Sequence, residues 1–106
     1  MFINLTPHTI NMVNASGEVT LAIEPELTPA RCKVEREVAF SVAGFDVNRS
    51  VFGEVVGLPP VQDETWYIVS RIVAEAAKTR KDLLVPDETA RDEEGRIVGC
   101  KSFATI

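Results

Sequence analysis

The sequence is poor in the residues that hold metal ions. Its 106 residues include one histidine, His8, and two cysteines, Cys32 and Cys100, which form no CxxC pair. One histidine cannot build a histidine-rich site, and the cysteine spacing is not that of a zinc module. The acidic stretch 87–95 lacks the spacing of a calcium-binding EF-hand loop. We therefore expect no metal, no cofactor and two free thiols.

Long hydrophobic runs and an excess of basic residues are also missing. No apolar stretch approaches the ~20 residues that span a bilayer, and the first residues lack the basic and apolar regions of a signal peptide. Eleven Lys and Arg against 16 Asp and Glu give a formal net charge of -5, whereas binding along a nucleic-acid backbone needs a basic face. These absences predict a cytoplasmic protein with neither a membrane nor DNA or RNA as its partner.

The length and the pattern of the chain predict one domain over residues 1–106, because the chain is too short for two hydrophobic cores. Apolar alternation and turn residues bound a series of predicted strands, and the stretches between them, including 44–50 and 87–95, read as loops. The predicted strands cover residues 2–5, 9–13, 19–23, 30–40, 51–58, 66–69, 82–85 and 96–106.

One helix is predicted at about 71–80. Ile72, Val73, Ala76 and Ala77 form its apolar stripe, and Ser70 is a suitable N-cap. The basic residues of 78–81 would complement the helix C-terminus. The predicted fold class is α+β, a mainly antiparallel twisted or barrel-like sheet with this one helix. The short run 66–69 suits a strand buried on both faces, and the order strand, helix, strand over 66–85 resembles a compact crossover.

The junction between strand and helix at Ser70 and Arg71 is one candidate for an anion site. A helix N-terminus presents unpaired N–H groups, and a hydroxyl beside a guanidinium suits phosphate or carboxylate. The alternative is that Ser70 only caps the helix and that Arg71 is solvated.

Two Arg–Asp combinations and a polar N-terminal turn are further candidates. Arg80 with Asp82, and Arg91 with Asp92, are typical of ion pairs that shape loops, but they can also present a guanidinium to a ligand. Asn4, Thr6 and His8 have good hydrogen-bonding capacity, and a purely structural turn is the alternative. Trp66 and Tyr67 could stack on a base, although aromatic residues in a strand more often belong to the core.

Several short motifs follow one another along nearly the whole chain, and in this order they resemble a group of small uncharacterised proteins encoded by bacteriophages, prophages and some bacteria. The resemblance carries no catalytic residues. By analogy with small phage proteins that act as oligomeric sponges, it implies capture of a nucleotide immune signal in the host bacterial cytoplasm. The motifs are NLTPH at 4–8, VFG at 51–53, GLP at 57–59, YIVS at 67–70, RxDL at 80–83, Pro86, RDxxG at 91–95 and GC at 99–100.

These observations favour a homo-oligomeric protein that sequesters a nucleotide-like ligand, such as a cyclic nucleotide, without cleaving it. The candidate residues lie at predicted strand ends and are rich in donors but poor in general bases. Two alternatives stay open: a small nucleotide hydrolase or lyase that uses His8, Asp82 or Asp92, and a phage protein-protein interaction or inhibitor module. Apolar residues for self-association are Phe45, Val47, Val51 and Phe52, and the predicted ligand-binding residues are Asn4, Thr6, His8, Ser70, Arg71, Arg80, Asp82, Arg91 and Asp92.

Overall fold

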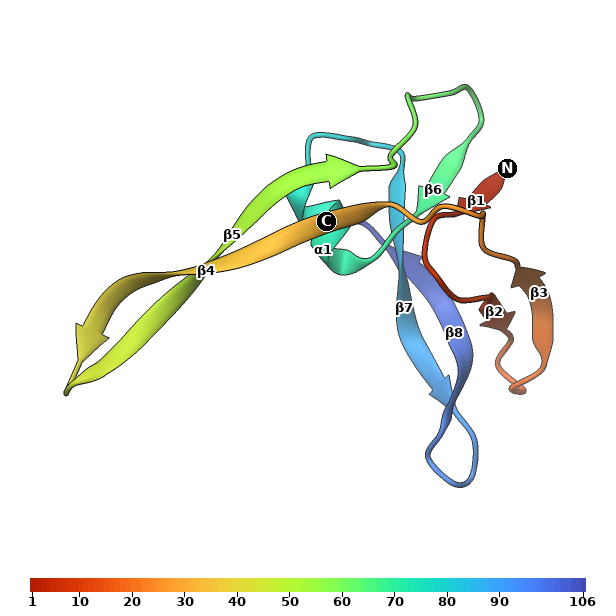
Figure 1. The fold of residues 1–106 in the computed structure, drawn as a ribbon. Coiled ribbons are helices and arrows are strands. Elements are labelled where there is room, and N and C mark those ends of the chain that lie inside the picture. The colour runs from red at the N-terminus through yellow and green to blue at the C-terminus, as the bar shows by residue number, and fades with distance from the viewer.

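The computed structural model describes all residues from 1 to 106 and consists mostly of strands with one short helix (Figure 1). Six strands form a central sheet, and the two longest form a separate ribbon that projects from it. The elements in chain order are β1 (Phe2–Asn4), β2 (Ile10–Val13), β3 (Val19–Ile23), β4 (Arg31–Val42), β5 (Phe45–Val56), β6 (Trp66–Ile68), α1 (Arg71–Ala76), β7 (Leu83–Arg91) and β8 (Ile97–Ala104).

The central sheet has the order β1-β6-β7-β8-β2-β3 and is mixed rather than mainly antiparallel. Strand β6 runs parallel to both β1 and β7, and β2 runs parallel to β8. The pairs β7–β8 and β2–β3 are antiparallel hairpins. The parallel pairing of β6 and β7 follows from the helix between them, because a strand can return parallel to its predecessor only through a crossover connection.

The sheet curls into an almost closed barrel, and Asn4 lies on the seam. The backbone of Asn4 forms a parallel bridge with Pro25, just beyond β3, and its carbonyl accepts a hydrogen bond of 2.9 Å from the N–H of Glu26. The first and last strands of the sheet are thereby joined. Closure of this kind satisfies backbone groups that an open sheet edge would leave unpaired.

The hydrophobic core lies on both faces of β6. Tyr67 and Val69 pack with Val73 of the helix in one cluster, whereas Ile68 packs with Ile10 and neighbours in a second cluster inside the curled sheet. Tyr67, Ile68 and Val69 are fully buried, as predicted for a strand covered on both sides. The core is nevertheless small, since 17 of 106 residues are buried.

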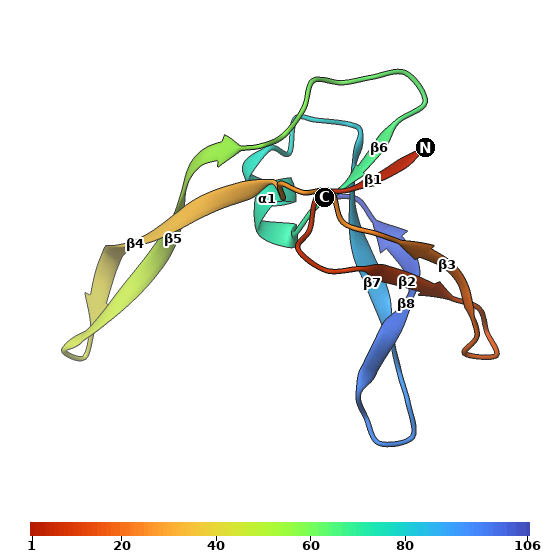
Figure 2. The ribbon, with the colours of Figure 1, turned by 45° about the vertical axis from the view of Figure 1, so that its right-hand side comes forward.

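Strands β4 and β5 form an antiparallel ribbon, here called the arm, that extends away from the sheet in both views (Figures 1 and 2). Ala43 and Gly44 connect the two strands with φ angles of 51° and 85°. Two positive φ angles define the tight hairpin turn that matches the twist of the flanking strands. The radius of gyration is 16.5 Å, larger than the ~13 Å of a compact chain of this length, because the arm stands apart from the body.

Three expectations about secondary structure were wrong. Residues 45–50 belong to β5 rather than to a loop, and β7 continues to Arg91 through the stretch expected to be an acidic loop. Polar side chains are compatible with these strands because both protrude into solvent. The helix ends at Ala76 instead of residue 80, and its last turn holds no basic residue. Lys78, Arg80 and Lys81 therefore lie in the connection that follows it.

Candidate functional site

The nine residues predicted to bind a ligand do not meet in one pocket of a single chain. Asn4, Thr6, His8 and Ser70 lie near the carboxyl ends of β1 and β6. Arg80 and Asp82 lie at the opposite end of these strands, before β7 begins. Arg91 and Asp92 lie at the tip of the β7–β8 hairpin. Arg71 lies at the start of the helix α1.

Asn4 has a structural role. Its side-chain amide donates hydrogen bonds to the carbonyl oxygens of His8 at 2.8 Å and Ile23 at 2.9 Å. Its side-chain oxygen accepts from the N–H of Thr6 at 2.9 Å and from the Thr6 hydroxyl at 2.6 Å. The residue is 1% exposed, so it ties the N-terminal turn to the end of β3 and offers little to a ligand.

Thr6, His8 and Ser70 do line a common hollow, with a volume of about 360 Å³. The hydroxyl of Ser70 accepts a hydrogen bond of 3.3 Å from the N–H of Val73, which confirms Ser70 as the N-cap. Arg71 is exposed and is not part of this lining. The hollow contains no lysine, arginine or acid and its exposed surface is mostly apolar, so nothing in its lining favours an anion. The other residues of its lining are Thr9, Ile10, Asn11, Val69, Pro86, Thr89, Ile97, Val98, Gly99 and Cys100.

Arg80 and Asp82 form a fixed and largely buried ion pair. Nε of Arg80 donates to one carboxylate oxygen of Asp82 at 2.8 Å, and Nη2 donates to the other at 2.7 Å. The side chains are only 21% and 11% exposed, and the guanidinium lies 5.9 Å from the centre of the Tyr67 ring. Hydrogen bonding to Arg80 lowers the pKa of Asp82 from its usual value, and the same bond raises the pKa of Arg80.

A second hollow, of about 400 Å³, opens beside this ion pair and is called here the Trp66 hollow. The indole of Trp66 is 42% exposed, unlike its fully buried neighbour Tyr67. Lys81 also lines the hollow and forms no ion pair within the chain. A smaller depression of about 150 Å³ adjoins it, since Arg80 and Lys81 line both, and Lys78 lines the smaller one. The lining of the Trp66 hollow is completed by Val61, Glu64, Thr65, Thr79, Arg80 and Asp82.

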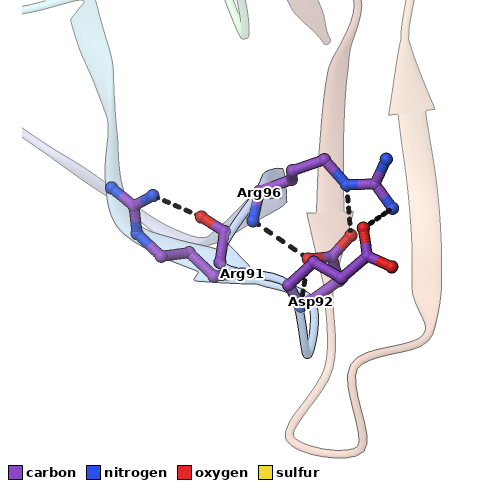
Figure 3. A network of polar contacts seen from close by, with 5 residues as sticks. Arg91, Asp92 and Arg96 are labelled. Carbon is purple, nitrogen blue, oxygen red and sulfur yellow. Dashed lines mark hydrogen bonds and ion pairs between the residues drawn. The ribbon is translucent and has the colours of Figure 1, made fainter.

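Arg91 and Asp92 shape the hairpin turn between β7 and β8 (Figure 3). One oxygen of Asp92 accepts hydrogen bonds of 2.9 Å from the backbone N–H groups of Glu94 and Arg96, and the other accepts from Nε of Arg96 at 3.1 Å. Arg91 donates to the carbonyl of Gly95 at 2.7 Å. The backbone N–H of Arg96, with smaller contributions from Glu94 and the Arg96 side chain, lowers the pKa of Asp92. Both residues therefore shape the turn, but the expected ion pair between them does not form, because Asp92 pairs with Arg96.

Sequence reasoning missed the contribution of Lys81 and considered Trp66 more as a core residue than as a ligand contact. A usable signal was present, because three of the four residues from Lys78 to Lys81 are basic in a chain with a net charge of -5. Once the helix ends at Ala76, these residues no longer serve its C-terminus and are free to form a cationic surface beside Trp66.

Comparison with known proteins adds no assignment: no family model, no curated protein and no solved structure matches the chain. No helix in the structure combines the length and the apolar character that crossing a membrane requires. Both cysteines are free, with Cys100 buried and Cys32 half-buried. Burial raises the pKa of the Cys100 thiol. The structure itself defines a small, sheet-dominated protein with a hollow lined by Trp66 and by charged residues of both signs, and with a protruding arm.

Proposed function

We propose that this protein binds a small anionic ligand with an aromatic ring, of the nucleotide kind, and holds it intact in the Trp66 hollow. One observation carries the proposal: a half-exposed indole lies beside Lys81 and the fixed guanidinium of Arg80, around a hollow of about 400 Å³. This volume falls within the ~300–1,000 Å³ of small-molecule sites.

The ligand class follows from the side chains of the lining. An exposed indole offers a flat surface on which a base can stack, an interaction worth about 1–3 kcal/mol. The pair with Asp82 occupies two of the five N–H donors of Arg80, so the remaining donors are available for phosphate oxygens. Thr79 adds a hydroxyl group at the same rim, whereas the hydroxyl of Thr65 donates to the carbonyl of Asp63 at 3.0 Å. Together these groups match a base joined to a phosphate.

The local charge favours an anion even though the whole chain is acidic. Asp82 is neutralised by Arg80, which leaves Lys81 and Lys78 as cations without an ion-pair partner. On the lining of the Trp66 hollow Glu64 offsets Lys81, so the surplus cation is Lys78 in the adjoining depression. A concave surface focuses the potential of the charges around it, so the two lysines can attract a phosphate despite the net charge of -5.

The geometry favours binding over cleavage. A general acid or base must exchange its proton near the working pH. Asp82 is held as a carboxylate by two hydrogen bonds from Arg80, and Asp92 is engaged by the hairpin turn. His8 lines the other hollow, at the far end of the strands. The three residues expected for a hydrolase therefore do not act on a ligand beside Trp66.

The biological use that we propose is capture of a nucleotide signal of the host, the role implied by the resemblance to small phage proteins. Titration with cyclic dinucleotides, cyclic ADP-ribose isomers and linear nucleotides tests the binding, and chromatography of the ligand recovered after heat denaturation tests whether it is intact. We expect saturable binding of at least one member of the panel and its release unchanged.

Two substitutions locate the site. Trp66→Leu keeps an apolar side chain but removes the stacking surface, and Lys81→Gln removes one cation. Each should weaken binding about tenfold, which corresponds to ~1.4 kcal/mol. Arg91→Gln at the hairpin tip is the matched control and should bind like the wild type. No binding across the panel, or a loss with Arg91→Gln but not with Lys81→Gln, contradicts the proposal.

A further inference from the structure

The arm carries apolar side chains that no part of the same chain covers. Phe40 lies directly opposite Val47, and Val42 lies directly opposite Phe45. Residues two apart along a strand share a face, so these four side chains form one patch at the end of the arm, called here the tip patch. They are between 36% and 75% exposed.

The apolar surface continues towards the base of the arm. Val34 lies opposite Phe52 on the same face, and Val38 is also exposed there, although the pair of Arg36 and Ser50 lies between them. Val51 lies opposite Glu35 and faces the other side of the ribbon. From their exposed fractions, the seven apolar residues of this face from Val34 to Phe52 present roughly 600 Å² to solvent, somewhat less than the ~800 Å² that each partner contributes to a standard protein interface. This is at the upper end of the ~300–600 Å² of the largest apolar patch on a typical monomer.

Charge indicates what covers this surface. From residue 31 to residue 56 the arm has equal numbers of cationic and anionic side chains, so it carries no net charge, and the entire net charge of -5 lies on the rest of the chain. In two copies of the chain the negatively charged bodies repel each other, whereas the uncharged arms do not. The charged side chains of the arm are Arg31, Lys33, Arg36 and Arg49 against Glu35, Glu37, Asp46 and Glu54.

We infer that the arm is a self-association surface whose occupant is a second copy of this chain, packed arm against arm with the two tip patches in contact. A two-fold arrangement brings the same patch of both copies together, and an uncharged apolar patch is complementary to itself. The interface also adds buried apolar area to a molecule in which 17 of 106 residues are buried. The inference does not depend on the ligand proposed above.

Sedimentation equilibrium of the full chain tests this inference. The wild type should have twice the monomer mass, and Phe45→Asp should be monomeric, because each association would bury a carboxylate in the tip patch. Val19→Asp is the matched control: Val19 is also the exposed apolar residue that opens the second strand of a hairpin, and it is 54% exposed. It should leave the dimer intact.

A charge-swap mixture identifies the occupant. Phe45→Asp mixed with Phe45→Lys should restore dimers that contain one copy of each, because the opposite charges meet across the arm–arm contact. Far-UV circular dichroism checks that each variant is folded. A monomeric wild type, a dimer that survives Phe45→Asp, dissociation by Val19→Asp, or a mixture that stays monomeric overturns the inference.

Discussion

The arm and the body of this protein are built from similar strands but are stabilised differently. The strands β2 and β4 both alternate apolar and polar residues over part of their length, yet Val38 on the arm is 55% exposed, whereas Ile10 in β2 is buried. The body gains its stability from apolar surface removed from water. The arm is held by its backbone ladder and by side-chain pairs across two strands. An isolated two-stranded hairpin is marginally stable in water, so the arm depends on its base and on whatever covers its tip.

The base of the arm is the one part that shares the core. Cys32 and Val55 face each other near the start of the ribbon and pack against the cluster around Tyr67 and Val73. Beyond them the arm leaves the body (Figure 2). An alternating pattern therefore predicts a strand, but it does not show whether the apolar face of that strand packs against the rest of the same chain.

The largest expected difference between the body and the arm is the loss of unfolding free energy when one apolar side chain is truncated. Ile68→Ala should lower the free energy of unfolding by about 3 kcal/mol, because it leaves a cavity in a fully buried cluster. Val38→Ala on the arm should change it by less than about 0.5 kcal/mol in the monomeric Phe45→Asp background. Urea denaturation measures both. Equal losses at the two positions would show that the arm is buried within one chain.

A second effect concerns the buried ion pair of the body. Asp82→Asn should cost about 2 kcal/mol at neutral pH, because it leaves the Arg80 guanidinium partly buried without its carboxylate. The exposed arm pair gives the contrast: Arg49→Gln, which removes the partner of Glu37, should cost less than about 1 kcal/mol.

The ion pair of Asp82 also predicts a pH dependence. The folded-state pKa of Asp82 is below its unfolded value, so the folded protein holds fewer protons there and the stabilisation is complete above the unfolded pKa of about 3.9. It is lost as the pH falls through the lowered folded value. The difference in stability between wild type and Asp82→Asn should therefore shrink below that window in urea melts. A difference that stays constant down to strong acid would exclude this linkage.

The smallest expected effects compare two glycines. A Cβ at Gly99 would lie 2.5 Å from the carbonyl oxygen of Asn11, where β8 meets β2, and Gly99→Ala should cost about 1–2 kcal/mol. Gly44 in the arm turn has open space around it but a φ of 85°, so Gly44→Ala should cost about 1 kcal/mol. Hydrogen exchange should show faster exchange confined to the arm for Gly44→Ala, and loosening of the body for Gly99→Ala. If the amides of the arm were protected from exchange equally well in Gly44→Ala and in the wild type, the turn would not require a glycine at this position.

Local signals in the sequence predicted several elements correctly. The hairpin of β2 and β3 follows from alternation around the turn at Gly17, and Ser70 caps the helix as expected. The run from Trp66 to Val69 was predicted as a strand buried on both faces, which is confirmed for Tyr67, Ile68 and Val69 but not for Trp66, and the direction of its partners was left open. Each of these predictions depends only on residues that are close together in the sequence.

The candidate site was harder to predict. The sequence does not show the strand directions, so residues at opposite ends of the strands were predicted to line one pocket. Thr6, His8 and Ser70 do share a hollow, but Arg80 and Asp82 lie at the amino end of β7, across the length of the sheet. The Trp66 hollow depends on where the helix stops, and helix ends are weakly encoded when no glycine or proline follows directly.

From the sequence alone it follows that this chain forms strands with one capped helix, where most of its turns fall, and that three of the four residues from 78 to 81 are basic. These properties follow from backbone sterics, alternation and composition, which act over a few residues. Long-range packing, by contrast, places β6 between two parallel neighbours, joins the sheet at Asn4 and leaves the ribbon of β4 and β5 free. Those outcomes depend on contacts between residues that are far apart in the sequence. Their contribution to the folding free energy depends on which apolar faces can be buried against one another.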